Sequence, residues 1–504
     1  MASAAPAQGL PALTSADMGF GQEPSFGAPS AWQPPQRTDL PAETRGYYPG
    51  RADKGQGGGL RGAAPARFAQ ASGGTSLPPG VTPDPSVPPQ APAPRRDRPR
   101  SWSERLGLGN ISTKVFGHAK GGAAARDEST LADPDGGWEA DAILDGYLGA
   151  EVSAITQGGL EYGVAVGLRG AYDSDGPLFG GQVGGCPVGA VCPGQVTLGG
   201  QAFALRGHTS QLFTGLEAYD HDSRLALETA HIFLRSGYGD VTVGRDVGAA
   251  ELFSLGAPTV LELGLSNGRA DYTSLSVAKS TNDPTAFSEK VTFTTPRLGG
   301  DRIGIGFQAG ASFTPDVDAC GAYTCVRRNG SEKAVGSIGA TLEDAWEVGV
   351  ALDRTMGDLK AELTATYAQA GLKESLAAFD DLRSWGLGAE VEWGDFTLGG
   401  GYLASNNALT DGDYTSWDLG VAYRFGALGA EWGVSGAYAS AEDENVGVES
   451  DEWTFGVSRS FGDIHVGTGL QRVTRDVPTL IGGVATLEEE TSTAVFIETG
   501  WSFE

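Results

Sequence analysis

The sequence predicts an all-β protein, a transmembrane antiparallel β-barrel of about sixteen strands. Apolar and polar residues alternate along many segments of the chain, which is the periodicity of a strand whose two faces meet different surroundings. Connections alternate between tight turns and long loops, and aromatic residues gather at the strand ends. Barrels that cross a membrane have short turns at one end, long loops at the other and an aromatic belt at each interface.

The alternation is clearest between residues 383 and 404. One face of the first segment is apolar and the other carries glycine and glutamate, as shown by Trp385, Leu387, Ala389, Val391 and Trp393 against Gly386, Gly388, Glu390 and Glu392. A tight Gly394-Asp395 turn follows, and the apolar face then resumes. The aromatic residues expected near short turns are Trp393, Phe396, Phe425 and Phe461; those expected near long loops are Trp385, Tyr402, Trp417, Tyr438 and Trp453. A soluble sandwich would place such aromatics in mid-strand.

Sixteen segments have strand character, and an even number lets the first and last strands pair. Closure satisfies every backbone group in lipid, which an open sheet does not do. The expected strands are 110–118, 138–155, 160–171, 227–236, 240–246, 288–297, 302–313, 346–355, 358–369, 383–393, 395–404, 414–425, 427–439, 452–460, 462–473 and 490–503. No stretch of about 18 consecutive apolar residues is present, so no spanning helix is expected.

Residues 1–109 form a separate region that contains 18 of the 27 prolines. Such a composition buries too little apolar surface to fold, so we expect a disordered periplasmic leader before a barrel at 110–504. Its basic end, around Arg95 to Arg105, is suited to contact peptidoglycan or anionic lipid, although a solvated linker explains the same charges. Residues 1–7 resemble the remnant of a signal peptide with a small-x-small cleavage site at Ala5-Pro6-Ala7.

The charge is divided unevenly between these two regions. The leader has 11 Lys+Arg against 8 Asp+Glu, whereas the remainder has 24 against 55. A strongly acidic body repels the phosphates of nucleic acid, so a nucleic-acid partner is not expected. The same charge suits a surface or pore that tolerates cations, although part of it serves solubility.

The four cysteines form two local pairs, Cys186 with Cys192 and Cys320 with Cys325. Five residues lie between the cysteines of the first pair and four between those of the second. Such spacings permit tight disulfide loops in an oxidising compartment. Neither pair has the two-residue spacing or the adjacent histidine that is typical of a zinc site. We therefore expect two disulfides in exposed loops rather than free thiols or metal ligands, and no cofactor.

Three segments resemble the Gram-negative trimeric porins. They are "YGDVTVGRDVGAAELFS" from Tyr238, "EKVTFTTPRLGGDRIGIGFQAGASFTPD" from Glu289, and the closing "TAVFIETGWSF". The resemblance covers roughly residues 110–504. It implies a sixteen-stranded homotrimeric barrel in the outer membrane, in contact with lipid and lipopolysaccharide, that passes ions and small hydrophilic solutes. It also implies an inward-folded third loop, at about 247–287. The chain departs from this family in its leader, its long loop at 172–226 and its final Glu504.

Permeation requires a wet lumen, a constriction and a field that sorts solutes by charge. Alternation points a set of charged side chains into the lumen, namely Lys114, Arg169, Arg235, Lys360, Arg424, Glu161, Glu347, Asp353, Glu362, Glu390, Glu392 and Asp418. His118 and His231 point inward as well and are expected to be polar wall residues. Our hypothesis is that Glu251 and Glu262 of the inward loop face Lys114, Arg169 and Arg235 across the constriction. The excess of acid predicts a weak preference for cations.

Three other functions compete with a general diffusion channel. An autotransporter-like adhesin is expected to have about twelve strands, and its passenger is long and repetitive. A barrel enzyme needs a serine–histidine pair or paired acids, and "GHTS" (207–210) and "YDHDS" (219–223) match no hydrolase motif; no enzymatic activity is expected. A channel for one substrate, such as a sugar, would show an aromatic ladder along the lumen, where we expect small and charged residues.

Overall fold

The structure is a computed structural model. It describes residues 111–130, 136–156, 159–173, 181–185, 194–198, 201–215, 224–264, 271–299, 304–317, 337–373, 376–427, 429–481 and 484–503. The leader, both cysteine pairs, "YDHDS" and Glu504 therefore lie outside the described residues.

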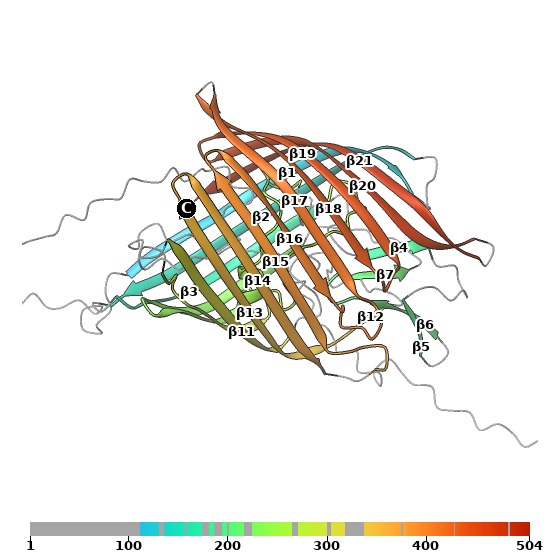
Figure 1. The fold of residues 1–504 in the computed structure, drawn as a ribbon, viewed down its shortest axis with the longest axis horizontal. Helices are drawn as coiled ribbons and strands as arrows, with labels where there is room; N and C mark the ends of the chain where they lie inside the picture. Colours follow the sequence, from blue (N-terminus) through green and yellow to red (C-terminus); the bar gives the residue numbers. More distant parts are fainter. Residues whose placement is uncertain are drawn as a thin grey trace, which may run out of the picture.

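Sixteen antiparallel strands close into a barrel (Figure 1). In order around the wall they are β1 (Ile111–Ser129), β2 (Gly137–Ile155), β3 (Glu161–Asp173), β8 (Arg224–Ser236), β9 (Gly239–Arg245), β10 (Glu289–Thr294), β11 (Ile305–Asp316), β13 (Leu342–Met356), β14 (Leu359–Leu372), β15 (Leu382–Trp393), β16 (Phe396–Ser405), β17 (Tyr414–Ala427), β18 (Ala430–Asp443), β19 (Val448–Phe461), β20 (Ile464–Ile481) and β21 (Val484–Phe503). β1 pairs with β21 over Gly117–Ser129, which seals the wall. The predicted fold class and each of the sixteen expected strands are confirmed.

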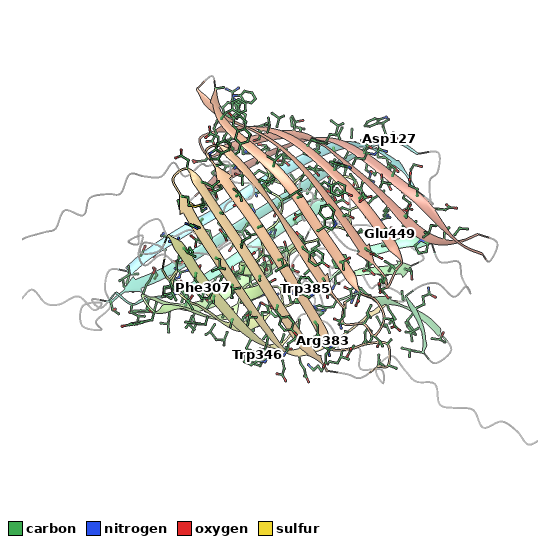
Figure 2. The ribbon with its side chains drawn as sticks, viewed as in Figure 1. Asp127, Phe307, Trp346, Arg383, Trp385 and Glu449 are labelled. Carbon is green, nitrogen blue, oxygen red and sulfur yellow. The ribbon has the colours of Figure 1, made fainter. Side chains whose placement is uncertain are left out.

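The wall follows the predicted alternation because one face meets lipid and the other faces inward. On β15 the outward Trp385, Leu387 and Trp393 are exposed, whereas Gly386 and Gly388 are buried. Outward aromatics pair across strands: the ring centroids of Trp385 and Tyr402 lie 5.0 Å apart. Figure 2 shows Trp346 and Trp385 near the end of the barrel that carries the long loops. These rings form the aromatic belt at that interface.

The largest differences from the expected boundaries lie in the first strand and in the last hairpin. The first strand does not end at residue 118 but continues to Ser129, through a run of glycine and alanine. Small residues carry little apolar–polar contrast, so the alternation fades there although the backbone still pairs with β2 and β21. The last hairpin is also longer than expected, because β20 and β21 remain paired to Ile481 and Val484.

Two long loops occupy the interior and the mouth of the barrel. The described part of the third loop (246–264 and 271–288) contains the short helix α2 (Ala249–Leu252) and is largely buried inside the wall, which confirms the predicted inward fold. The second loop (174–223) includes β4 (Gly181–Gly185), β5 (Gln195–Leu198), β6 (Gln201–Arg206) and β7 (Leu212–Gly215). β4 pairs with β7, and β6 lies between β5 and β12 (Ser337–Gly339). In the described residues no helix is long and apolar enough to span a membrane.

Candidate pore and its inner lining

The third loop runs along the inner wall on a track of inward glycines. A Cβ at Gly349 would lie 2.7 Å from the Phe253 side chain, and one at Gly420 would lie 2.9 Å from Ala257. A Cβ at Gly401 would collide with the carbonyl oxygen of Leu255. We define the glycine track as the wall positions against which the outgoing loop lies, namely Gly349, Gly388, Gly401, Gly420, Gly433 and Gly456. Their missing side chains leave room for the loop to lie directly against the backbone of the strands.

Wall carboxylates and hydroxyls then bind the outgoing loop by its backbone. Asp418 Oδ2 accepts from Ala257 N at 2.8 Å, and Ser435 Oγ accepts from Val260 N at 3.2 Å. Glu498 accepts from the backbone N–H groups of residues 262, 263 and 264, the last two at 3.0 Å. A carboxylate that accepts several N–H groups makes charge-assisted hydrogen bonds, which are stronger than neutral ones. The loop is therefore fixed to the wall as far as β21.

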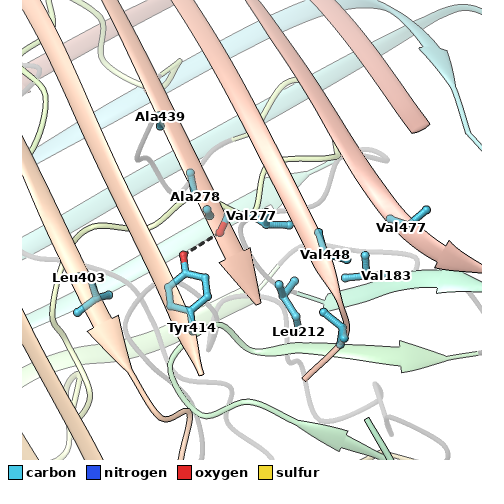
Figure 3. Close-up of a cluster of buried hydrophobic side chains, with 11 residues drawn as sticks. Val183, Leu212, Val277, Ala278, Leu403, Tyr414, Ala439, Val448 and Val477 are labelled. Carbon is cyan, nitrogen blue, oxygen red and sulfur yellow. Dashed lines mark hydrogen bonds between the residues drawn. The ribbon is translucent and has the colours of Figure 1, made fainter. Parts of the chain in front are cut away.

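The loop then returns above its outgoing path. Gln471 Oε1 accepts from Tyr272 N at 3.2 Å, and Ser416 Oγ accepts from Lys279 N at 3.0 Å. The Tyr414 hydroxyl donates to the Val277 carbonyl at 2.8 Å, the dashed line in Figure 3. Two passes of one loop thus line the wall from β13 to β21 and set the cross-section of the lumen.

The two loop acids predicted for the constriction lie in different surroundings. Glu262 forms an ion pair with Lys120 of β1, with Nζ and Oε2 at 2.6 Å. Glu251 lies on α2, and its side chain is buried. A loop acid therefore does face a basic wall residue, but this residue is Lys120 rather than Lys114, Arg169 or Arg235.

Those expected wall cations are bound to wall carboxylates. Arg169 pairs with Asp145 and lies 3.4 Å from Glu228. Arg235 lies 3.4 Å from Glu151 and 3.9 Å from Glu161. Both arginines can be buried because each guanidinium is paired with carboxylates and hydrogen-bonded.

Lys114 and Arg126 extend this network along β1. Lys114 lies opposite Glu151 in the register of β1 and β2. Nearer the long loops, Arg126 lies within 4 Å of three carboxylates, those of Glu128, Glu139 and Asp141. We call the inner wall of β1, β2, β3 and β8 the charged sector.

On the inner side of β14 and β15, carboxylates also outnumber basic side chains. Lys360 pairs with Glu392 at 2.9 Å, and the next inward pair in the register is Glu362 with Glu390. Arg424 donates from Nη2 to the Thr259 carbonyl at 3.0 Å. That contact attaches the third loop to β17.

The remaining predicted lumen residues also lie on the inner side of the wall. Glu347 holds the loop, because it accepts from Ala250 N, Thr285 Oγ1 and Ser312 Oγ. Asp353 pairs with Arg297. His118 lies 3.8 Å from Asp145, and His231 lies 3.5 Å from Asp246. Glu347 and Asp418 were expected to face water but are covered by the loop.

Sequence reasoning missed three groups of residues. Lys120 was missed because the first strand was ended at residue 118, two residues too early to include the next inward position. Glu498 was missed because it occupies an inward position of a strand read only as a closing strand. The glycine track was read as ordinary small lining, since alternation shows that a residue points inward but not what covers it.

A family model described as Gram-negative porin matches residues 101–476. The chain belongs to this family. It is therefore an outer-membrane channel protein of Gram-negative bacteria. No sequence among curated proteins matches the chain.

Solved porin structures match the chain at low sequence identity. An anion-selective porin from Comamonas acidovorans is 14% identical, with 78% of this chain and 100% of that chain covered and a TM-score of 0.45. OprB of Pseudomonas putida is 12% identical, with 80% of this chain and 95% of that chain covered and a TM-score of 0.47. OmpF of Salmonella typhi, in complex with daunomycin, is 12% identical, with 79% of this chain and 99% of that chain covered and a TM-score of 0.43.

Proposed function

We propose that the chain forms a water-filled channel for passive diffusion of ions and small hydrophilic solutes, with a weak preference for cations. The observation that carries the preference is the excess of carboxylates around the inner arginines. Arg126, Arg169 and Arg235 lie within 4 Å of seven carboxylates altogether. A lumen with a net negative wall concentrates cations and repels anions.

Planar-bilayer recording of the refolded chain in a salt gradient tests the channel and its preference together. We expect ohmic conductance and a reversal potential of the sign that cation flow produces. The double variant Glu390→Gln/Glu392→Gln is expected to move this potential toward zero, since it removes two inward charges. Asp451→Asn removes a charge from the exposed outer face and serves as the control. An anion-selective wild type would refute the preference without refuting the channel.

The two loop acids are tested in the same way. Glu262→Gln leaves Lys120 with a neutral partner at the contact that measures 2.6 Å, so it is expected to weaken the cation preference. Glu251→Gln is the companion variant on α2. If both variants keep the conductance and ion preference of the wild type, the third loop does not set the field of the pore.

Homotrimer formation is a second part of the proposal. The outer face of β1 and β2 supports it, because this face is rich in small residues around the exposed Leu144, namely Ala119, Gly121, Ala123, Ala125, Ala140, Ala142 and Gly146. Small residues let two walls approach closely in a membrane. Ala123→Trp is expected to abolish the trimer band on mild electrophoresis, whereas Leu419→Trp on β17 should retain it. Retention by both variants would exclude this face as the interface.

Several earlier expectations bear on this function. The sixteen strands argue against the autotransporter-like adhesin, for which about twelve were expected. Of the "GHTS" motif, His208 Nε2 bonds the Pro284 carbonyl at 2.8 Å, and Ser210 N donates to Asn407. That arrangement suits a structural contact, so we infer transport without catalysis. A sugar-specific channel would fit an aromatic ladder, but the inner Phe116 and Tyr147 are buried in a cluster with the third loop.

We also propose that residues 1–109 form a periplasmic leader that contacts peptidoglycan, and that the two cysteine pairs form disulfides in outer loops.

A further inference from the structure

The described part of the second loop reaches the rim of the outer mouth opposite the strands that the loop connects. It leaves the wall at β3 and returns at β8, the third and fourth strands in the closed order. Its turn at 207–211, which we call the latch turn, is bound at Asn407, between β16 and β17. These are the eleventh and twelfth strands, so eight of sixteen places separate the two ends of the crossing. The latch turn is therefore bound at the point of the rim that lies opposite the two strands from which the loop starts.

Asn407 holds the latch turn from the far rim. Its Oδ1 accepts from Thr209 N at 3.2 Å and from Ser210 N at 3.0 Å, and its carbonyl accepts from His208 N at 2.9 Å. Its Nδ2 donates to Asp443 Oδ2 at 3.1 Å, which fixes the orientation of the amide. Asn407 has φ of +53°, a conformation that asparagine tolerates better than most residues. Beside it, the hydroxyls of Thr209 and Ser405 lie 2.6 Å apart.

The latch turn also contacts the third loop beneath it. His208 Nε2 bonds the Pro284 carbonyl at 2.8 Å, and Lys279 Nζ donates to the Thr209 carbonyl at 3.4 Å. Lys279 is itself paired with Asp283. The second loop thus lies directly on the loop that lines the pore.

Apolar packing extends the contact on both sides of the turn. Leu212 and Val183 of the second loop belong to a buried cluster with inward residues of five wall strands, including Leu403, Tyr414 and Val477 (Figure 3). Leu205 belongs to a second cluster over β13 to β15. Residues 207–214 are all buried. This loop therefore contacts the wall of its own barrel along much of the far rim.

We propose that the second loop is a lid on the outer mouth, fastened to its own barrel by the latch turn, and that acid releases it. The proposal rests on the channel function argued above. In the closed state the lid restricts the entry of solutes from outside, and its release exposes the vestibule above the third loop.

Burial supports the response to acid. It lowers the pKa of His208 from 6.5 to about 4, and the Lys279 ammonium acts in the same direction. The charged groups around the turn are Lys279 and Asp283 on the third loop and Asp443 on β18, which hydrogen-bonds both Ser210 of the turn and Asn407. The released turn takes up a proton below about pH 6.5 and the latched turn only near pH 4, so closure weakens as pH falls through this window. Between pH 7 and pH 5 the closed-to-open ratio is expected to fall roughly 20-fold.

A disulfide between the latch turn and the barrel wall tests the lid proposal. In Thr209→Cys/Ser405→Cys the two sulfurs replace hydroxyls that lie 2.6 Å apart, and a disulfide there holds the lid closed. Oxidised channels are expected to keep a low, pH-independent conductance, and dithiothreitol is expected to restore the wild-type response. The single-cysteine variants and the wild type with dithiothreitol are controls, because the chain has four further cysteines. If oxidised and reduced double variants conduct alike, the lid proposal is wrong although the channel stands; a complete lack of conductance in every variant refutes the channel instead.

Two further variants separate the latch from its pH dependence. Asn407→Gly tolerates the positive φ but removes the acceptor of two N–H groups, so it is expected to conduct at pH 7 as the wild type does at pH 5. Its control is Asn406→Ala, since Asn406 bonds Asp381 and Arg383 rather than the second loop. His208→Gln can still donate to Pro284 but cannot be protonated, and is expected to lose the increase on acidification. An unchanged acid response in His208→Gln would overturn the role of this histidine.

Discussion

The space inside the barrel is filled in different ways on the two sides of the wall. In the charged sector, inward side chains fill the space themselves, as Arg169 does between Asp145 and Glu228. From β13 to β19, many inward positions are glycine, and the third loop fills the space that they leave. The first arrangement needs every charge to have a partner, whereas the second needs room and hydrogen-bond acceptors. The pore is thus bounded by paired charges on one side and by anchored backbone on the other.

The largest effect is expected in the charged sector. Arg169→Ala leaves two buried carboxylates without their cation, which costs about 3–5 kcal/mol. The unfolding temperature of the detergent-solubilised barrel, followed by circular dichroism, measures this loss. Lys373→Ala breaks an exposed pair with Asp316 at 3.2 Å and is expected to cost about 0–1 kcal/mol. Equal losses would show that the inner pairs are as solvated as the surface pair.

A smaller effect is expected on the glycine track. In Gly401→Ala the new methyl meets the Leu255 carbonyl, and such overpacking costs about 1–3 kcal/mol. Because the loop is displaced toward the lumen, single-channel conductance should also fall. Gly426→Ala lies on the same sheet with nothing within 4 Å of the added carbon, and should change neither quantity. A normal conductance in Gly401→Ala would mean that the loop does not bound the pore at this height.

The smallest effect is expected on the outer face of the loop-lined side. Trp417 and Tyr438 have ring centroids 5.2 Å apart, and an aromatic pair contributes about 0.5–1.5 kcal/mol beyond its area. Trp417→Leu should lower the unfolding temperature slightly, and Trp417→Phe by less, while conductance stays unchanged because the change faces lipid. A change in conductance would contradict the assignment of this residue to the outer face.

The charged sector was read from the sequence better than the loop-lined side. Period-two alternation placed Lys114, Arg169 and Arg235 inward because a strand has only two faces. It did not show which carboxylates approach each arginine, since partners come from neighbouring strands at distances set by register. On the loop-lined side, Glu347 and Asp418 were assigned inward but not as loop anchors, because a loop has no periodicity to predict its path.

The sequence by itself determined the barrel: the number of strands, the face of each residue and the two aromatic belts follow from alternation and turn spacing, which are local properties of the chain. Only the tertiary structure decided what fills the barrel. Glu262 meets Lys120, glycines far apart in the sequence form one track, and a turn rooted at β3 and β8 is fastened at Asn407. The first and the last of these contacts join residues more than 100 positions apart. Such long-range pairing depends on closure of the whole wall rather than on any single segment.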